Sequence, residues 1–266
     1  MSNYEIAILG AGNLGQALAR GFANEMGVEK IILTRRHLSR AEHLKEEGFA
    51  LTDDNLKAVR ESTYIVLCVQ PRQLGDLLAE IEAELDFEKH VLVSTITGVE
   101  LSKIQAYLKD EYAIIRAMPN TAAGIRESMT CICGNKLSEK SLPIVEAQFK
   151  NLGETLIIEE RLMKSATVLA ASGIAFFLRY IRAATQGGIE LGFEADEALK
   201  IATQTAKGAA SLLVERNAHP EREIDRVTTP MGCTIAGLNE MEHQGLSSAL
   251  IKGITASYEK INKIAE

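Results

Sequence analysis

The feature that most constrains this chain is the turn between its first apolar run and its first helical stretch. Residues 5–9 read as a strand, residues 16–25 have helical character, and GAGNLG at residues 10–15 joins them. In a GxGxxG turn at this place, the first glycine bends the chain, the second lets a pyrophosphate approach and the third lets the helix pack closely. The start of the helix adds free N–H groups and a positive dipole end. A GxGxxG alone is a weak signal, but this context favours dinucleotide binding over an ordinary loop. The predicted binding residues are Gly10, Gly12, Asn13, Leu14 and Gly15.

The residues after the second predicted strand, 30–34, bear on the choice of dinucleotide. An NAD-binding fold usually places Asp or Glu about twenty residues beyond the glycine turn, on the ribose hydroxyls. Here Arg35 and Arg36 occupy that place. Guanidinium groups match a 2′-phosphate, so we expect NADP(H) to be preferred, with NAD(H) possible. The alternative is that the two arginines only solvate a loop.

Composition bounds the fold and the partners. The chain has 266 residues, of which 46% are hydrophobic, enough for one large domain or, as we prefer, two. A formal charge of -7 gives no broad basic footprint, which argues against nucleic acid as a partner. The first residues show no signal-like pattern, and we find no apolar run long enough to span a bilayer. We therefore expect a cytoplasmic protein with no membrane partner.

The cysteines and histidines predict no metal site. Only Cys131 and Cys133 are close in sequence, and in a strand they would point the same way, as a pair of small core residues. A zinc site would need a second such pair. The five histidines are scattered without a ligand spacing.

Strands and helices alternate through the first 120 residues or so. Predicted strands are residues 30–34, 49–51, 64–69, 90–94 and 113–116, and predicted helices are residues 39–47, 73–84 and 100–109. The alternation predicts an α/β fold with a doubly wound parallel sheet, whose ligands lie beyond the carboxyl ends of the strands. Loops 10–15, 34–36, 69–71, 94–98 and 117–121 lie there. Further cofactor-binding candidates are Asn55, Val69, Gln70, Pro71, Thr97 and Asn120.

The character of the chain changes after residue 160. Short strands at 130–133 and 154–158 flank a helix at 142–152 and close the sheet, and long helical stretches at 163–191, 195–216 and 234–264 follow. Helices that are apolar around most of their circumference must be covered. We therefore predict a Rossmann domain at 1–159 and a helical domain at 160–266, through which two subunits interlock as a homodimer or higher oligomer.

The most specific segment of the helical half is DRVTTPMGCTIAGL at residues 225–238. Thr, Pro and Gly before an apolar helix create a helix N-terminus with free amides and hydroxyls, which suits a carboxylate. On this local pattern alone, an ordinary capped helix is the more frequent explanation.

Five segments in order resemble the pyrroline-5-carboxylate reductase family over nearly the whole chain. They are GAGNLG at 10–15, CVQP at 68–71, RAMPNT at 116–121, SGIAF at 172–176 and the segment at 225–238. The resemblance implies a Rossmann domain with a helical dimerisation domain, and reduction of the ring C=N of 1-pyrroline-5-carboxylate to proline by NAD(P)H. It places the active site between the cofactor of one subunit and the helical domain of its partner.

The resemblance also implies roles for individual residues. Thr234 would form a hydrogen bond with the imine nitrogen and act as the catalytic residue. Asn120 would line the nicotinamide side. The backbone N–H groups of Gly232, Cys233 and Thr234 would hold the substrate carboxylate, and Thr229 would also bind the substrate.

Some positions depart from the family pattern. Gln70 stands where lysine is common, and Met231-Gly232-Cys233 stands where a Gly-Gly pair is common. Ala170, Ala171 and Ile174 replace Ser, Gly and Pro of SGSGPAY. A paralogue that acts on another cyclic imine is therefore an alternative.

Two other classes of protein remain as alternatives. A hydroxy-acid dehydrogenase would place a proton-transferring Lys or His in the helical domain. Lys164, Lys200 and Lys207 are available there, but they lie in no motif of that kind. A non-catalytic nucleotide sensor would keep the glycine turn and lose the segment at 225–238.

Overall fold

The computed structural model describes residues 3–264, and the chain divides into two compact units. One unit joins the residues up to Ser172 to the end of the chain from Ser257, and the other is Gly173–Ala256. Residues 160–172 and the end of the last helix, which the sequence assigns to the helical domain, are thus grouped with the first unit. The domain boundary at 159/160 stays a prediction.

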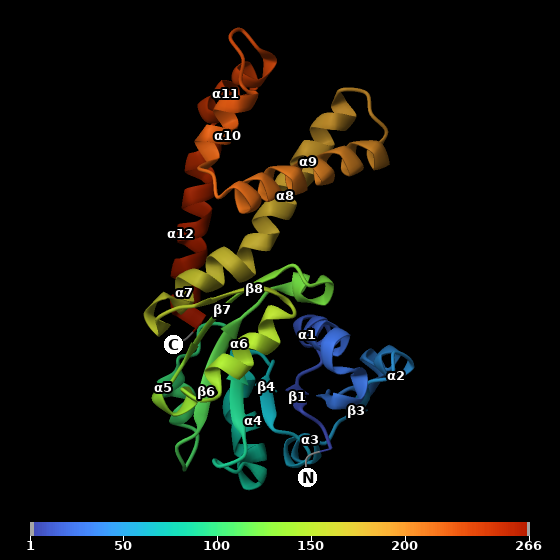
Figure 1. Ribbon diagram of the computed structural model, residues 1–266, viewed down its shortest axis with the longest axis vertical. Helices are drawn as coiled ribbons and strands as arrows, with labels where there is room; N and C mark the ends of the chain where they lie inside the picture. The colour runs from blue at the N-terminus through green and yellow to red at the C-terminus, as the bar shows by residue number, and fades with distance from the viewer. Residues whose placement is uncertain (1–2, 265–266) are drawn as a thin grey trace. The chain divides into compact units, whose positions relative to one another are not determined.

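An eight-stranded sheet in the order β3-β2-β1-β4-β5-β6-β7-β8 forms the first unit (Figure 1). The strands are β1 Ile6–Leu9, β2 Ile31–Thr34, β3 Ala50–Thr52, β4 Tyr64–Leu67, β5 Val91–Ser94, β6 Ala113–Met118, β7 Ser128–Gly134 and β8 Gly153–Ile157. The order of the first six is that of a doubly wound dinucleotide-binding fold. The predicted fold class is therefore confirmed.

One strand pair departs from the predicted parallel sheet, because β7 runs antiparallel to β6. The connection from Met118 to Ser128 holds only a short 3₁₀ segment, Thr121–Ile125. A parallel crossover needs about a dozen residues or more, so this connection reverses the chain instead.

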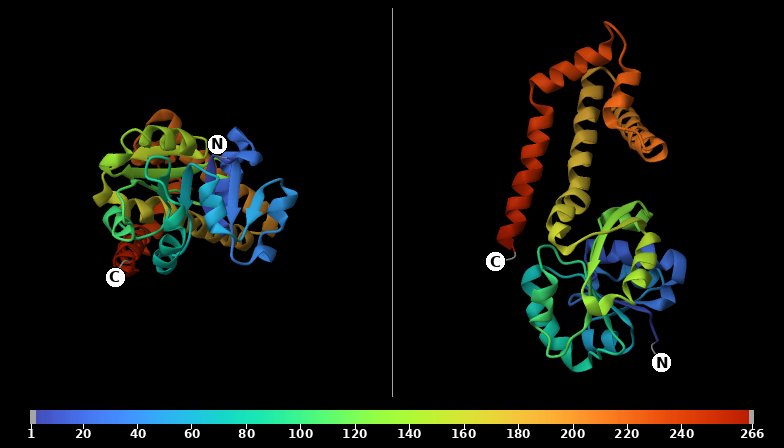
Figure 2. Two further views of the ribbon diagram at one scale, coloured as in Figure 1. Left: turned by 90° about the horizontal axis from the view of Figure 1, so that it is seen from below. Right: turned by 60° about the vertical axis from the view of Figure 1, so that its left-hand side comes forward.

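Alternate residues of the strands feed two hydrophobic clusters, one on each face of the sheet. In β1, Ile6 and Ile8 belong to one cluster, while Ala7 and Leu9 belong to the other. The first cluster is covered by α1 (Asn13–Met26), α2 (His43–Glu46) and α6 (Leu142–Lys150). The second is covered by α3 (Asn55–Arg60), α4 (Leu74–Ile81), α5 (Leu101–Gln105) and α7 (Met163–Ala166). The helices on both sides of the sheet can be followed in Figures 1 and 2.

The chain leaves α7 through a π-helical turn, Thr167–Ser172, and continues as α8 (Gly173–Glu190). Such turns are rare and occur often at functional sites. Here the turn ends where the SGIAF segment begins.

The second unit is helical, with two differences from the sequence-based prediction. Its helices are α8, α9 (Ala195–Arg216), α10 (Pro220–Val227), α11 (Cys233–His243) and most of α12 (Leu246–Ile264). The single helix predicted over 234–264 is wrong, because Gly245 adopts φ +81° and separates α11 from α12. The prediction also missed α10, a short and very polar helix that starts with Pro220 at its first turn.

The helical unit buries little apolar surface on its own. Ala198 is the single buried hydrophobic residue of Gly173–Ala256, whereas Phe177, Leu191 and Val214 are 73%, 83% and 80% exposed. Apolar exposure on this scale marks an interaction surface.

By length and composition, the helical stretch Glu160–Glu190 could also cross a membrane. The expectation that no apolar run is long enough was therefore wrong, although core helices of soluble proteins pass the same test.

Candidate active site

The site is organised at the edge of the sheet where the parallel strands end. The strand order reverses direction between β1 and β4, and doubly wound folds bind their ligands outside the carboxyl ends at such a switch point. The loops after β1, β2, β4, β5 and β6 all reach this edge, because these strands are mutually parallel. They are the loops that the sequence predicts as ligand-binding.

Each of the three glycines in the turn after β1 is suited to its position for a different steric reason. Gly10 adopts φ +117°, and a Cβ there would collide with the carbonyl oxygen of Cys68. A Cβ on Gly15 would collide with the carbonyl oxygen of Gly10, so Gly15 lets α1 pack against the turn. A Cβ on Gly12 would meet nothing within 4 Å. Gly12 therefore keeps the turn open to an approaching group, which fits a pyrophosphate.

The N-terminus of α1 is free to bind an anion. Gly12 is its N-cap, no side chain caps it, and its first turn carries no acidic residue. The N–H groups of Asn13, Leu14 and Gly15 begin the helix, where they and the helix dipole favour negative charge. The structure thus brings the five predicted residues of the turn together.

Arg35 lies directly beside this turn. Its Nη1 donates to the carbonyl oxygen of Ala11 at 2.5 Å, and the backbone N–H of Ala11 donates to the carbonyl oxygen of Thr34 at 2.8 Å. The neighbouring Arg36 is exposed. Two guanidinium groups at the end of β2 and next to the glycine turn fit the 2′-phosphate of NADP(H).

The loop after β4 packs against the same turn. The N–H of Cys68 donates to the carbonyl oxygen of Leu9 at 2.9 Å, and Val69 lies next to Gly10. Gln70 is exposed and precedes Pro71, which starts a 3₁₀ turn. Burial raises the pKa of the Cys68 thiol to about 11, although a hydrogen bond with Thr95 opposes the shift. This cysteine therefore stays protonated near neutral pH and is no nucleophile.

The other predicted cofactor contacts differ in how free their side chains are. Thr97 is half-buried in the turn after β5. The amide nitrogen of Asn55 donates to both carboxylate oxygens of Glu80 at 3.1 Å. The amide of Asn120 is also occupied: Nδ2 donates to the carbonyl oxygen of Ala170 at 3.0 Å, and Oδ1 accepts from the N–H of Ala122 at 2.9 Å. The cofactor roles of all three stay predictions.

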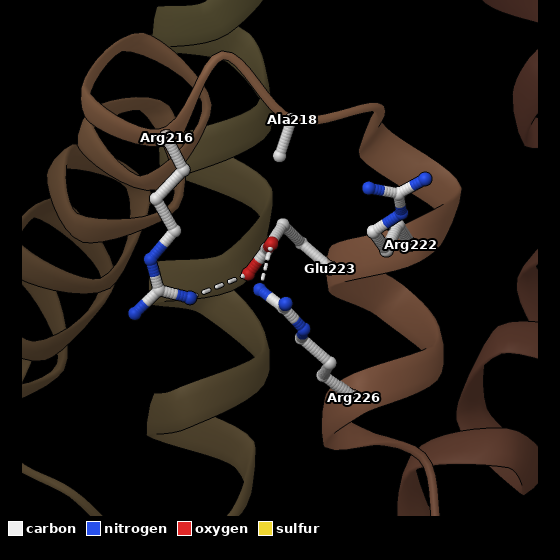
Figure 3. Close-up of a pocket in the computed structure, with 5 residues that line it drawn as sticks. All are labelled: Arg216, Ala218, Arg222, Glu223 and Arg226. Atoms are coloured by element: carbon white, nitrogen blue, oxygen red, sulfur yellow. Dashed lines mark hydrogen bonds and ion pairs between the residues drawn. The ribbon is translucent and has the colours of Figure 1, made fainter.

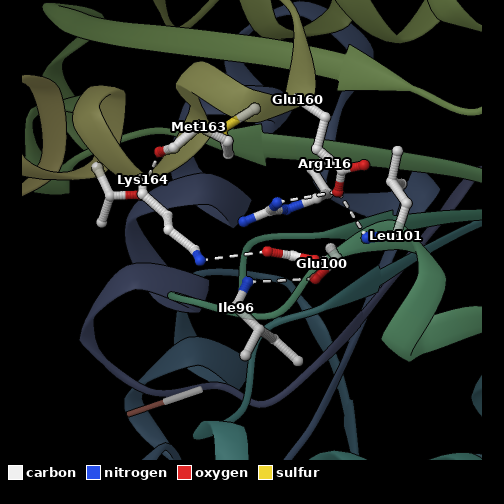
Figure 4. Close-up of polar contacts among 9 residues, drawn as sticks. Ile96, Glu100, Leu101, Arg116, Glu160, Met163 and Lys164 are labelled. Atoms are coloured by element: carbon white, nitrogen blue, oxygen red, sulfur yellow. Dashed lines mark hydrogen bonds and ion pairs between the residues drawn. The ribbon is translucent and has the colours of Figure 1, made fainter. Parts of the chain in front are cut away.

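A buried ion pair beside this edge was missed by the sequence analysis (Figure 4). The Arg116 side chain is 1% exposed, and its Nη1 donates to Glu160 Oε1 at 3.1 Å. The same oxygen accepts from the N–H of Leu101 at 2.7 Å. Nearby, Lys164 Nζ lies 3.2 Å from Glu100 Oε1. These contacts attach the segment that begins at Glu160 to β6 and α5. The only signal in the sequence was that Arg116 begins the RAMPNT segment.

The predicted substrate-binding residues surround the N-terminus of α11. Gly232 is the N-cap, no side chain caps the helix, and Cys233 and Thr234 form its first turn. The N–H of Gly232 donates to the carbonyl oxygen of Thr229 at 2.9 Å, so in this conformation it is not available to a ligand. The N–H groups of Cys233 and Thr234 can still receive a carboxylate.

A separate pocket in the helical unit lies near the junction of α9 and α10 (Figure 3). Its lining residues are Arg216, Ala218, Arg222, Glu223 and Arg226. The Glu223 carboxylate pairs with Arg216 at 3.0 Å and with Arg226 at 2.5 Å. This pairing offsets part of the positive charge, and no residue predicted for the active site lines the pocket.

The fold and the site geometry define a class, the nucleotide-binding oxidoreductases with a Rossmann unit followed by a helical unit. Residues 5–98 match the family model for coenzyme F420-dependent NADP oxidoreductases, and residues 160–264 match the model for pyrroline-5-carboxylate reductase dimerisation. Pyrroline-5-carboxylate reductase 2 of Dictyostelium discoideum is 46% identical to the chain, over 98% of the chain and 93% of the relative. The chain belongs to the pyrroline-5-carboxylate reductase family.

Two further comparisons agree. Pyrroline-5-carboxylate reductase 1 of Dictyostelium discoideum is also 46% identical, over 96% of this chain, but the chain spans only about half (49%) of that relative's length. The crystal structure of Plasmodium falciparum pyrroline carboxylate reductase with NADP bound has a TM-score of 0.91 at 23% identity and covers 100% of both chains. This structural likeness shows that the fold is shared over the full chain.

Proposed function

We propose that this protein transfers a hydride from NADPH to the ring C=N of 1-pyrroline-5-carboxylate and so forms L-proline, the last step of proline biosynthesis. The observation that carries the proposal is the uncapped N-terminus of α11, which begins with Cys233 and Thr234 in the segment most specific to the family. A hydroxy-acid dehydrogenase has less support, because the lysines it could use lie in no motif for proton transfer.

NADP(H) is the preferred cofactor, and NAD(H) remains usable. Gly12 leaves room for the pyrophosphate, while Gly10 and Gly15 allow the tight turn and the close packing of α1. The N–H groups of Asn13 and Leu14 receive the pyrophosphate. Arg35 and Arg36 hold the 2′-phosphate. The cofactor, when bound, supplies the hydride. The chain's own task is to hold the imine in the orientation that accepts it.

The substrate is bound through its carboxylate and its ring nitrogen. The N–H groups of Cys233 and Thr234, aided by the dipole of α11, bind the carboxylate. The Thr234 hydroxyl donates to the ring nitrogen, which gains electron density as the C=N bond is reduced. The nitrogen takes up one proton, relayed by this hydroxyl or taken from solvent, to complete the amine. Thr229 closes the other side of the turn through its bond with Gly232. The reaction asks for no chemistry from a cysteine thiol, a histidine or a metal.

The active protein is a homo-oligomer, at least a dimer, joined through the helical unit. The exposed apolar side chains of α8, α9 and α12 form the contact, and residues 160–264 match a dimerisation model. The nicotinamide is held by one subunit and the substrate by the α11 turn of a second. The apolar stretch 160–190 serves this contact rather than a membrane, and we place the enzyme in the cytoplasm, with no nucleic-acid partner.

The test is NADPH oxidation with pyrroline-5-carboxylate, run beside a hydroxy acid with NADP. We expect turnover of the imine and none of the hydroxy acid. Turnover of the hydroxy acid alone would favour the dehydrogenase. If neither is turned over, a second cyclic imine is tested with NADPH: its turnover would favour a paralogue, and nucleotide binding without any turnover would favour a sensor.

A further inference from the structure

The turn that leads into α11 has an unusual residue at its third position. Thr229 accepts a hydrogen bond from the N–H of Gly232 at 2.9 Å, which closes a four-residue turn with Pro230 second and Met231 third. Met231 adopts φ +59°. Proline second and a left-handed residue third is the pattern of a type II turn, in which the third position favours glycine or asparagine.

The backbone of Met231 is therefore strained for its residue type. Among the residues that the structure describes, non-glycine residues with positive φ are Arg126, Asn217 and Met231. Asn217 ends α9, and asparagine tolerates this conformation better than other side chains do. A long apolar side chain brings no such relief, and strain of this kind persists mostly where function requires it.

The Met231 side chain gains nothing from packing inside its own unit. Its exposed fraction is 102%, so the whole side chain is open to solvent in the single chain. It directly precedes Gly232, the N-cap of α11, and is thus adjacent to the N–H groups of Cys233 and Thr234. A strained methionine that packs against nothing in its own unit, next to the proposed substrate site, is free to contact a group outside that unit.

From these observations we propose that Met231 is a specificity-determining residue that limits the size of the imine ring. This inference rests on the proposed function, because it takes the α11 turn as the substrate site. The flexible thioether covers the ring of a bound five-membered imine and leaves too little room for a larger one. Glycine at this position would relax the backbone and remove the cover.

The experiment compares two substrates in the full-length protein and its variants. The probes are 1-pyrroline-5-carboxylate and 1-piperideine-6-carboxylate, whose ring is one methylene larger. For Met231→Gly we expect the ratio of kcat/KM for the larger imine to kcat/KM for the smaller imine to rise about tenfold or more. One additional methylene group changes discrimination by about this factor in a close-fitting pocket. We also expect a higher urea midpoint, because the strain is relieved.

Two further variants separate side-chain bulk from backbone strain. Met231→Leu keeps the bulk and should keep the substrate ratio of the parent. Asn217→Gly places glycine at another left-handed position of the same unit, and should leave the ratio unchanged. An unchanged ratio in Met231→Gly, or an equal rise in Met231→Leu or Asn217→Gly, would overturn the inference. If the parent reduces neither imine, the proposed function itself is wrong.

Discussion

Arg116 and Glu160 form a buried ion pair between β6 and the segment that leads into the helices. The Arg116 side chain is 1% exposed, Glu160 is 35% exposed, and Nη1 lies 3.1 Å from Oε1. Nε and Nη2 of Arg116 have no hydrogen-bond partner among the residues that the structure describes. Glu160 is thus the main compensation for a charge that is almost fully removed from water.

Removal of the Glu160 carboxylate should destabilise the sheet unit. Glu160→Ala leaves the Arg116 charge uncompensated and takes the acceptor from the N–H of Leu101. Breaking a fully buried pair costs about 3 to 5 kcal/mol, and the partial exposure of Glu160 reduces this to roughly 1 to 3 kcal/mol. Urea unfolding measures the change.

The control for this variant is Glu159→Ala. Glu159 and Arg161 form an ion pair in which both side chains are about 70% exposed, so its loss should change the urea midpoint little. Equal effects of the two variants would show that burial of Arg116 does not decide the stability of this segment.

Arg35 and Arg36 should set the cofactor preference. With both changed to Ala, the Michaelis constant for NADPH should rise about tenfold or more, since about 1.4 kcal/mol of lost phosphate binding is a factor of ten. The constant for NADH should change little. Steady-state kinetics with the two cofactors measures this. Arg40→Ala, which removes another exposed arginine close by, should affect neither constant, and a parallel rise for NADPH and NADH in the double variant would contradict the assignment.

Local patterns in the sequence were enough to predict the sheet unit. Runs such as residues 64–67 are apolar throughout because a strand covered on both faces has no polar side, and the glycine turn has strict steric needs. Strand direction was not predictable in the same way, because hydrophobicity does not distinguish the antiparallel β7 from a parallel strand. The short α10 was missed because it has only eight residues, of which most are charged.

The site was predicted less completely, because its contacts join residues far apart in sequence. Glu160 and Arg116 are separated by 44 positions, and no local spacing indicates that they pair. Asn55 and Asn120 are predicted to bind the cofactor, and no local pattern indicates that their amides also form hydrogen bonds to Glu80 and to Ala170. The left-handed backbone conformation of Met231 was not predictable either, because a sequence pattern does not specify a φ angle for methionine.

The exposed apolar face of α8 should be essential for assembly. Phe177, which is 73% exposed, lies in that helix, and Phe177→Asp places a charge where a second subunit would bury the ring. Sedimentation should show a dimer or larger assembly for the parent and a smaller, inactive species for the variant. Phe87→Asp, at a phenylalanine 56% exposed in the sheet unit, should leave assembly unchanged. A stable, active monomer of the parent at micromolar concentration would rule out the proposed contact.

Thr234 should contribute to turnover more than to binding. Thr234→Val keeps the shape of the side chain and removes the hydroxyl. A hydrogen bond that strengthens in the transition state is worth roughly 1 to 3 kcal/mol, so kcat should fall about fivefold to two-hundredfold. Thr255→Val, in α12, should keep the parent rate. If Thr234→Val binds NADPH normally and reduces the imine at the parent rate, Thr234 is only part of the first turn of α11.

The central claim is that a hydride passes from NADPH to the ring C=N of 1-pyrroline-5-carboxylate on this protein. The most direct measurement uses NADPH that carries deuterium in the transferred position and analyses the product by mass spectrometry. The account predicts proline with one deuterium on the ring carbon that was part of the C=N bond, formed in step with NADPH consumption. Oxidation of NADPH without proline, or proline without the label, would contradict it.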